Sequence, residues 1–320
     1  MSDEELDSQL QAVIDDIESE GVPEWHAMSV DCGRRVEDEL FTSDSRQEID
    51  FVRDLAFAGP HGEVPVRVYR PDRPGTDSRE TPLPTLVFAH GGGWTLGTLD
   101  SADDLCRNLA RRVGCIVVSV DYRLAPEHPF PAPLDDVYAA LEWTADNAET
   151  FGGDPSRLGV AGSSAGGNLA AAVALRASEF DGPDVSHQLL LYPITDHAFD
   201  TDSYAENGDG PLLTRADMAW FWEQYLRSPV DGANPYASVL RAGDDVLADL
   251  PPATVVTAGF DPLRDDGAAY AARLADAGVD AVHQHYPTMT HGFLSLADSV
   301  AVADEAFDAA AERVRSSLTT

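Results

Sequence analysis

The stretch VAGSSAGG, residues 160–167, decides the fold expected for this 320-residue chain. The apolar residues 158–161 are typical of a buried strand, and the small apolar residues 168–175 are typical of a helix that packs closely on a sheet. Between these segments two glycines frame Ser164 in a G-x-S-x-G motif. The motif alone arises by chance in about one chain in ten of this length. Its strand–turn–helix setting nevertheless predicts a nucleophilic serine on a tight turn.

So tight a turn strains the serine backbone, and its neighbours must lack a Cβ. The strain lifts the Ser164 hydroxyl clear of the sheet, and the helix that follows directs its N-terminal N–H groups at negative charge that develops nearby. Ser163 cannot be the nucleophile of such a motif, because the positions two residues before and two residues after it are Ala161 and Ala165 instead of glycines.

Upstream, the segment LVFAHGGGW at residues 86–94 predicts a buried strand that ends in three glycines. Consecutive glycines can turn their backbone N–H groups inward without interference from side chains. An oxyanion hole requires this arrangement to hold the negative oxygen of a tetrahedral intermediate. A flexible glycine-rich turn is the alternative, but the preceding strand and the flanking His90 and Trp94 favour the oxyanion hole.

Downstream, Asp261 and His291 each follow a predicted strand, at residues 254–260 and 283–286. Ser, then Asp, then His is the chain order of the α/β-hydrolase triad. Serine is a poor nucleophile until an imidazole takes its proton, and the imidazole needs a carboxylate to fix its tautomer and stabilise the imidazolium. The pattern therefore predicts a serine hydrolase on an α/β fold.

Five segments resemble the hormone-sensitive-lipase-like family of carboxylesterases: HGGGW (90–94), YRLAPEHPFPA (122–132), GSSAGGN (162–168), DPLRD (261–265) and HGF (291–293). The resemblance covers roughly residues 50–320 and implies an α/β-hydrolase fold, with a mostly parallel central sheet flanked by helices and a helical cap. It implies Ser164 as nucleophile, His291 as base and Asp261 as orienting acid. The implied oxyanion hole consists of the N–H groups of Gly92, Gly93 and Ala165. Family members usually have Asp where this chain has Ser163, so we expect different hydrogen bonding beside the nucleophile.

Other titratable residues of the chain have different expected roles. His90 is expected to brace the glycine loop rather than act as the base, and His128 is expected to be structural. Asp265 and Asp266 are interpreted as first-turn charges of a helix, where they favour its dipole. The chain has no H-E-x-x-H, no C-x-x-C, no calcium loop and no nucleotide-binding glycine motif, so we expect neither a metal nor a cofactor.

The charge of the chain is unusual. It has 56 acidic residues against 21 basic ones, a formal net charge of −35, and every basic residue is Arg. Such a surface repels itself in dilute solution, which predicts a salt-adapted protein from a high-salt cytoplasm. The same charge argues against binding to nucleic acid or to anionic membranes. No run of about 18 apolar residues predicts a membrane span. The three cysteines have no disulfide spacing and are expected to be core residues.

The chain is expected to divide into an N-terminal helical cap segment, residues 1–48, and a catalytic domain, residues 49–320, with a cap insertion at about 195–250. The insertion contains an aromatic helix whose side chains belong either to the core or to the pocket. An edge hairpin is expected over 49–68 and a polar loop over 72–84. Further helices are expected over 103–112, 133–147, 267–277 and 301–314. The residues expected to bind substrate are Trp94, Leu213, Phe221, Trp222 and Phe293.

Together these patterns predict a serine carboxylesterase that hydrolyses short- to medium-chain acyl esters through an acyl-enzyme. Two alternatives stay open: an amidase or deacetylase of small acylated metabolites, and a small-molecule receptor without turnover. The expected partner is a small ester. The sequence is compatible with a homodimer and does not identify the physiological substrate.

Overall fold

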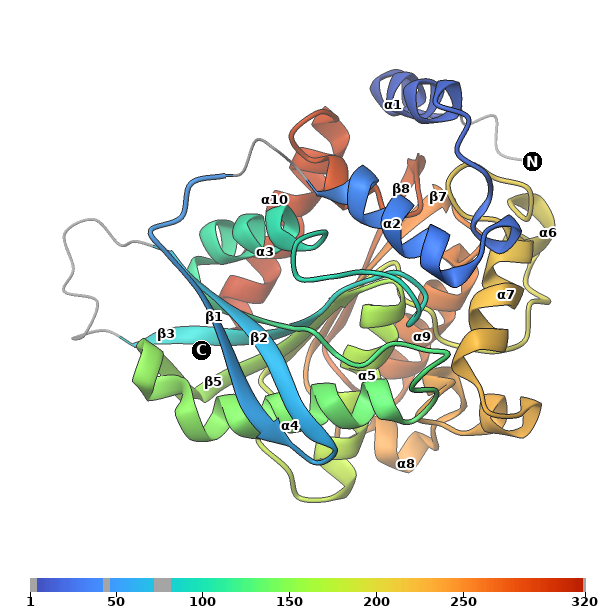
Figure 1. Cartoon of the computed structure of the whole chain (residues 1–320). Coiled ribbons are helices and arrows are strands. Elements are labelled where there is room, and N and C mark those ends of the chain that lie inside the picture. Colours follow the sequence, from blue (N-terminus) through green and yellow to red (C-terminus); the bar gives the residue numbers. More distant parts are fainter. Residues whose placement is uncertain (1–4, 43–46, 72–81, 319–320) are drawn as a thin grey trace.

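The central element is one eight-stranded sheet with the order β1-β2-β4-β3-β5-β6-β7-β8 (Figure 1). The structure is a computed structural model that describes residues 5–42, 47–71 and 82–318. The strands are β1 (Phe51–Gly59), β2 (Gly62–Arg70), β3 (Leu83–Ala89), β4 (Ile116–Val120), β5 (Gly153–Ser163), β6 (His187–Leu191), β7 (Ala253–Phe260) and β8 (Ala281–Thr290). Strands β1 and β2 form the expected hairpin, and β2 pairs antiparallel with β4. All other neighbours are parallel, which confirms the expected sheet. The loop expected over 72–84 lies mostly outside the described residues.

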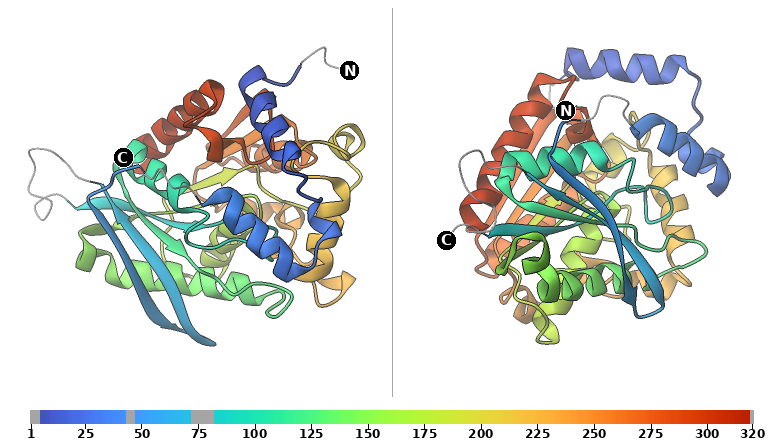
Figure 2. Two further views of the ribbon diagram at one scale, coloured as in Figure 1. Left: turned by 45° about the horizontal axis from the view of Figure 1, so that its top comes forward. Right: turned by 60° about the vertical axis from the view of Figure 1, so that its left-hand side comes forward.

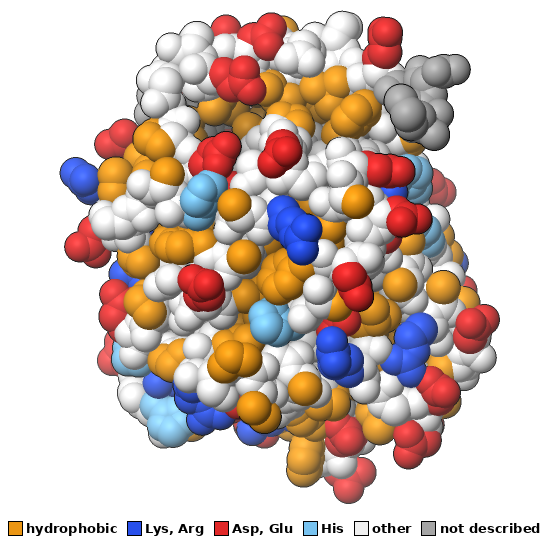
Figure 3. All heavy atoms as spheres, turned by 90° about the vertical axis from the view of Figure 1, so that its right-hand side faces the viewer, with side chains coloured by type: hydrophobic (Ala, Val, Ile, Leu, Met, Phe, Trp, Pro, Cys, Tyr) orange, Lys and Arg blue, Asp and Glu red, His pale blue; other side chains and the backbone are white. Residues whose placement is uncertain are grey.

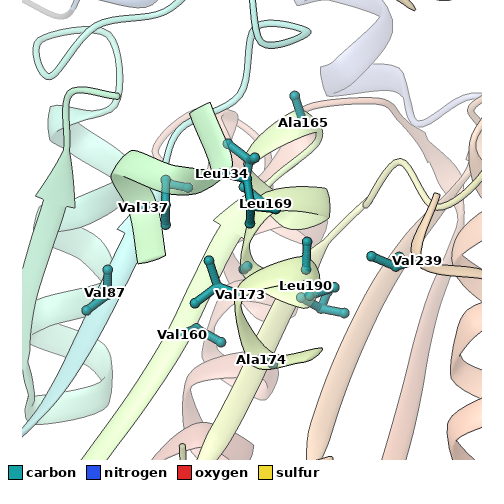
Figure 4. Close-up of a cluster of buried hydrophobic side chains, with 14 of the residues drawn as sticks. Val87, Leu134, Val137, Val160, Ala165, Leu169, Val173, Ala174, Leu190 and Val239 are labelled. Carbon is teal, nitrogen blue, oxygen red and sulfur yellow. The ribbon is translucent and has the colours of Figure 1, made fainter. Parts of the chain in front are cut away.

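Helices cover both faces of the sheet because alternate residues of its central strands point to opposite faces. On β3, Val87 packs with one core cluster and Leu86 with the other. The first cluster lies under α4 (Ala132–Asn147), α5 (Ala165–Glu179) and α9 (Arg264–Asp276). The second lies under α3 (Asp103–Leu109) and α10 (Ala301–Leu318). Figure 4 shows the first cluster, where Val87, Val160 and Leu190 of the strands meet Leu169 and Val173 of α5. Strands buried on both faces explain the uninterrupted apolar runs in the sequence.

Most of the expected helices are present, with shifted ends. The helix expected over 103–112 is divided, since α3 ends at Leu109 and a π-helical turn, η2 (Ala110–Gly114), follows. Helix α9 begins at Arg264, three residues before the expected start. The cysteines are all free. Cys106 and Cys115 are buried as expected, whereas Cys32 is only partly buried, so the expectation of a core residue was wrong there. Within the described ranges no helix has the length and apolar character needed to span a bilayer.

Two separate segments of the chain form helices over the site end of the sheet (Figure 2). The N-terminal segment consists of α1 (Ser8–Ser19), η1 (Trp25–Ala27) and α2 (Val30–Phe41). The insertion between β6 and β7 consists of α6 (Asp202–Glu206), α7 (Arg215–Tyr225), η4 (Pro229–Ala233), η5 (Val239–Arg241) and α8 (Asp244–Leu247). The remaining short helical turns are η3 (Ala148–Phe151) and η6 (Phe293–Leu296). The indole N–H of Trp25 donates to the Leu212 carbonyl (3.2 Å), which connects the two segments.

Candidate active site

Ser164 lies at the junction between β5 and α5, on the sharp turn that the glycine-framed motif predicts. Its φ is +55° and its ψ −117°, a region that residues with a Cβ rarely occupy. A Cβ on Gly162 would overlap the Gly166 carbonyl, and a Cβ on Gly166 would overlap the Ala89 carbonyl of β3. Both glycines are therefore sterically required, and α5 begins directly against the end of β3.

The structure brings Ser164, His291 and Asp261 together although they come from three different loops. The Nε2 atom of His291 lies 2.9 Å from the Ser164 Oγ, and its Nδ1 lies 2.8 Å from the Asp261 Oδ2. The other oxygen of Asp261, Oδ1, accepts the Leu263 N–H (2.8 Å), and the Asp261 side chain is fully buried. A carboxylate can only accept, so Nδ1 of His291 carries the proton and Nε2 has a lone pair for the serine hydroxyl. The geometry suits proton transfer from serine to imidazole.

The glycine loop after β3 is shaped by positive φ angles, +98° at Gly92 and +57° at Gly93. Tyr122 donates to the His90 carbonyl (2.9 Å), and its ring stacks on the His90 ring at 4.2 Å. The Nδ1–H of His90 donates to the Gly91 carbonyl (2.8 Å). Burial lowers the pKa of His90 to about 4, so this imidazole is neutral at pH 7. His90 thus braces the loop, as its position in the sequence predicts.

The third implied donor of the oxyanion hole, the N–H of Ala165, belongs to the first residue of α5. The first N–H groups of a helix have no acceptor within it, and they lie at the positive end of its dipole. The loop after β3 is next to this N-terminus, because Gly166 touches the end of β3. Backbone donors from two elements are therefore available beside Ser164 for a developing oxyanion.

A cavity of about 620 Å³ contains Ser164 and His291 in its wall. Both cap segments contribute to it, the N-terminal segment with Ile14, Ile17 and Trp25 among others, and the insertion with Leu213 and Phe221. The wall is mainly apolar, as binding sites for small ligands usually are. The cavity can hold a small ester next to the Ser164 hydroxyl.

Of the five residues expected to bind substrate, Leu213 and Phe221 line this cavity and the other three do not. Trp94 is fully buried and stacks on Tyr225 of α7, with 4.1 Å between the rings. Trp222 is 1% exposed and packs against the same Trp94 ring (4.6 Å). Phe293 is also fully buried, against Tyr192 and Tyr286. These three side chains belong to the packed core clusters and not to the cavity wall.

Much of the cavity wall comes from N-terminal residues that no sequence pattern assigned to it. The apolar side chains of this segment divide between the core and the cavity. Leu10 is fully buried in the core, whereas Leu6 and Ile17 line the cavity. Glu37 of α2 also lies in the cavity wall, and no sequence pattern distinguished it from the many other acidic residues. Ser163 stands where family members usually have Asp, and it lies against the Gly91 backbone. A Cβ on Gly91 would be 3.3 Å from the Ser163 Oγ.

Among the described residues, one cluster of side chains offers donor atoms suitable for a metal ion. Oxygen or nitrogen atoms of Glu24, His26 and Asp217 lie within 4.8 Å of one another, and Glu24 and Asp217 line the cavity. Oδ1 of Asp217 accepts the backbone N–H of His26 (2.9 Å) and lies 2.9 Å from Nδ1 of the same residue. Asp217 also forms a capping box with Thr214 at the start of α7. In this structure the cluster fastens η1 of the N-terminal segment to the first turn of α7.

The fold and the Ser–His–Asp site together define an α/β hydrolase. The family model described as alpha/beta hydrolase fold matches residues 86–295, and the chain belongs to this family. A solved ester hydrolase from the metagenome of Lake Arreo is 39% identical, with a TM-score of 0.91 over 98% of this chain and 100% of that one.

Curated relatives extend the comparison. The carboxylic ester hydrolase LipN of Mycobacterium tuberculosis is 49% identical over 77% of this chain, which spans only 65% of that relative. Arylacetamide deacetylase of Bos taurus is 34% identical over 77% of this chain and 75% of its own length. The matched proteins are thus named for the cleavage of esters and of an acetamide.

Proposed function

We propose that this protein is a serine carboxylesterase that hydrolyses short- to medium-chain acyl esters. The observation that supports this most strongly is the continuous hydrogen-bonded row Ser164–His291–Asp261 at the wall of a mainly apolar cavity. The names of the matched relatives agree with this class of enzyme.

The proposed reaction has two halves. Ser164 attacks the ester carbonyl while His291 takes its proton, and Asp261 stabilises the imidazolium that forms. The N–H groups of Gly92, Gly93 and Ala165 stabilise the oxyanion. His291 then protonates the departing alkoxide and leaves an acyl-enzyme. Water, activated by the same imidazole, attacks the acyl-enzyme and releases the acid and the free serine.

The two cap segments support a preference for small substrates. Residues 5–42 and the insertion at about 195–250 both contribute to the cavity wall and contact each other through Trp25 and His26. We propose that they act together as the cap. A cavity of about 620 Å³ closed by two segments suits a small acyl ester better than a long lipid chain.

Substitution of Ser164 by Ala tests the assignment. Nitrophenyl butyrate hydrolysis should fall below about 1% of the wild-type rate, since only the oxyanion hole and binding then contribute. Ser163→Ala is the matched control, because the neighbouring hydroxyl has no part in the proposed reaction. A Ser164→Ala enzyme that keeps more than this fraction would overturn the proposal.

A deacetylase acting on acylated amines is the second candidate, supported by the match to arylacetamide deacetylase. The same triad cleaves amides, but the leaving amine must be protonated more completely than an alkoxide. Rates on a matched pair, phenyl acetate and acetanilide, separate the two activities. A larger kcat/KM for acetanilide would assign the enzyme to the amidases.

We also propose that the enzyme works in a high-salt cytoplasm. Figure 3 shows acidic side chains scattered over one face of the molecule rather than gathered in one patch. With a net charge of −35, repulsion between them opposes the compact state until salt screens it.

A further inference from the structure

The imidazole of His291 has to face two different oxygens in the proposed reaction, first the Ser164 Oγ and then the oxygen of the leaving alcohol. Its hydrogen bonds with Asp261 (2.8 Å) and Ser164 (2.9 Å) act at opposite sides of the ring. A ring held at two atoms can still tilt about the line that joins them. The next residue, Gly292, has a φ of +79° and open space where a Cβ would lie, so packing at Gly292 does not restrict this tilt.

The side chain of Tyr192 lies where it can restrict the tilt. Its ring is 4.9 Å from the His291 ring and inclined to it by 64°, in an edge-to-face arrangement. Among the described residues, no other aromatic ring contacts the imidazole. Edge-to-face pairs are favourable beyond the area that they bury. A tilt of the imidazole in one direction would therefore break this contact, and a tilt in the other direction would drive it into the Tyr192 ring.

The Tyr192 ring is itself held by a backbone that is bonded to the nucleophile turn. Tyr192 directly follows β6, and the carbonyl of Leu191 accepts the Ser164 N–H (2.8 Å). The Tyr192 N–H donates to the Val256 carbonyl of β7 (2.7 Å). Its φ of +39° is rare for a residue with a Cβ, and such strain persists where the surrounding structure fixes the backbone, often at active sites. The ring therefore has a defined position relative to Ser164.

The hydroxyl group of Tyr192 does not account for its place beside the imidazole. The side chain is 2% exposed, and burial raises the pKa of the hydroxyl. The group therefore stays protonated at neutral pH and does not act as a base. The ring also packs on Phe293, with 6.0 Å between the two centroids, inside the second core cluster. The ring, and not the hydroxyl, is thus the part of Tyr192 that can act on His291.

We propose that Tyr192 is a positioning residue, whose ring holds the His291 imidazole at the tilt that carries a proton from Ser164 to the leaving alcohol. This inference deepens the proposed esterase function and rests on it. Nε2 of His291 takes the serine proton as the bond from Oγ to the ester carbon forms, and it gives this proton to the alkoxide as the ester C–O bond breaks. The second transfer depends most on the tilt, because Nε2 must then reach a different oxygen.

The test compares two acetates whose leaving groups differ in their need for a proton. Ethyl acetate releases an alkoxide that His291 must protonate, whereas the nitrophenolate of 4-nitrophenyl acetate leaves without protonation. Both esters form the same acetyl-enzyme, and kcat/KM reports the steps up to its formation. The values are measured at pH 7.5 in molar KCl, with titration of the released acid for ethyl acetate.

Variants of Tyr192 separate the ring from the hydroxyl. Tyr192→Leu removes the ring, so kcat/KM for ethyl acetate should fall about tenfold or more, with a smaller fall for nitrophenyl acetate. Tyr192→Met fills the same space with a flexible chain and should give this pattern if the Leu variant does not fold. Tyr192→Phe keeps the ring, and both of its kcat/KM values should stay near those of the wild type.

Tyr286→Leu is the matched control. Tyr286 also packs on Phe293, with 5.5 Å between the ring centroids, and it lies against the same core cluster. Among the described residues its ring makes no aromatic contact with His291. This control loosens the same cluster and should keep the wild-type ratio of the two kcat/KM values.

The ratio between the two esters distinguishes positioning from a loss of structure. A folded Leu or Met variant with both kcat/KM values near wild type would overturn the inference. An equal fall for both esters would do the same, because the leaving group would then make no difference, as would an ester-dependent fall in the control. A Tyr192→Phe enzyme with the pattern predicted for the Leu variant would assign the effect to the hydroxyl and refute the role of the ring. Failure of the wild-type enzyme to hydrolyse either acetate would instead contradict the proposed function.

Discussion

Replacing Asp261 by Asn should abolish most of the activity while leaving the fold intact. The carboxylate makes two contacts of 2.8 Å, one with the Leu263 N–H and one with the His291 Nδ1. Asn can keep the first contact only through its carbonyl oxygen, which turns its NH₂ group toward His291. The imidazole must then accept at Nδ1 and carry its proton on Nε2. In that tautomer it cannot take the proton from Ser164.

The size of the effect follows from the loss of the general base. Inversion of the tautomer in a serine triad lowers the rate about 10⁴-fold, equivalent to about 5 kcal/mol of transition-state stabilisation. The assay is nitrophenyl butyrate hydrolysis at pH 7.5 in molar KCl, with circular dichroism to verify folding. Asp265→Asn is the matched control, because that carboxylate contacts Arg264 and the Ser203 N–H rather than the imidazole. A folded Asp261→Asn enzyme within a hundredfold of wild type, or an equal loss in the control, would refute the assignment.

Four further predictions concern the loop, the pocket, one carboxyl and the charge. Gly93→Ala should lower kcat more than tenfold, because the new Cβ would collide with the Phe221 ring of the cap. Gly278→Ala is the control: this glycine also has a positive φ but faces open space, so the substitution should cost only about 1–2 kcal/mol of stability. Leu213→Ala should extend the range of accepted acyl chains in an ester series, whereas Trp222→Ala should destabilise the fold by about 3–5 kcal/mol in urea unfolding. The folded-state pKa of Glu37, about 7, lies above its ordinary 4.5, so its contribution to stability is present below pH 4.5 and lost as the pH rises through 7. Above pH 7 the Glu37→Gln protein should therefore be more stable than the wild type, with a free energy of unfolding higher by up to roughly 3 kcal/mol. Melting temperature should rise steeply between dilute buffer and molar KCl, because the Debye length falls from about 30 Å at 0.01 M salt to about 3 Å at 1 M.

Each of these predictions has a contradicting result. If Gly93→Ala and Gly278→Ala lowered kcat equally, backbone strain alone, and not the collision with the cap, would explain the effect of Gly93→Ala. An unchanged chain-length profile for Leu213→Ala would remove that residue from the pocket. A Glu37→Gln protein whose stability parallels wild type at pH 5 and pH 8 would show that the carboxyl does not titrate near neutrality. Equal melting temperatures in dilute and molar salt would end the proposal of salt adaptation.

The sheet and the reacting groups were predictable from the sequence because they follow from chain order. Ser164, Asp261 and His291 each come directly after a strand, and parallel strands bring their carboxyl ends to one edge of the sheet. The glycine triplet follows another such strand. These positions depend on strand direction alone, so the sequence was enough to place the groups near one another.

The pocket wall was less predictable, because it depends on which side of each cap helix faces inward. Phe221 and Trp222 are neighbours on α7, about 100° apart around the helix axis. Phe221 faces the cavity, while Trp222 meets Trp94 in the core. The presence of two adjacent aromatic residues in the sequence does not show which of them faces the cavity. Glu37 was hidden for another reason: in so acidic a chain, a carboxylate destined for burial resembles all the exposed ones.

The close contact between Gly166 and the end of β3 has a consequence for how this enzyme can be altered. With no room for even a methyl group between the nucleophile turn and the strand that leads into the glycine loop, the two must move as one rigid body. The cap helices above them come from other parts of the chain, and the Phe221 side chain of α7 packs against Gly93 of the glycine loop. Exchanging those helices for the corresponding ones of a relative should therefore change which esters are admitted, while the spacing between the serine oxygen and the backbone donors stays as it is.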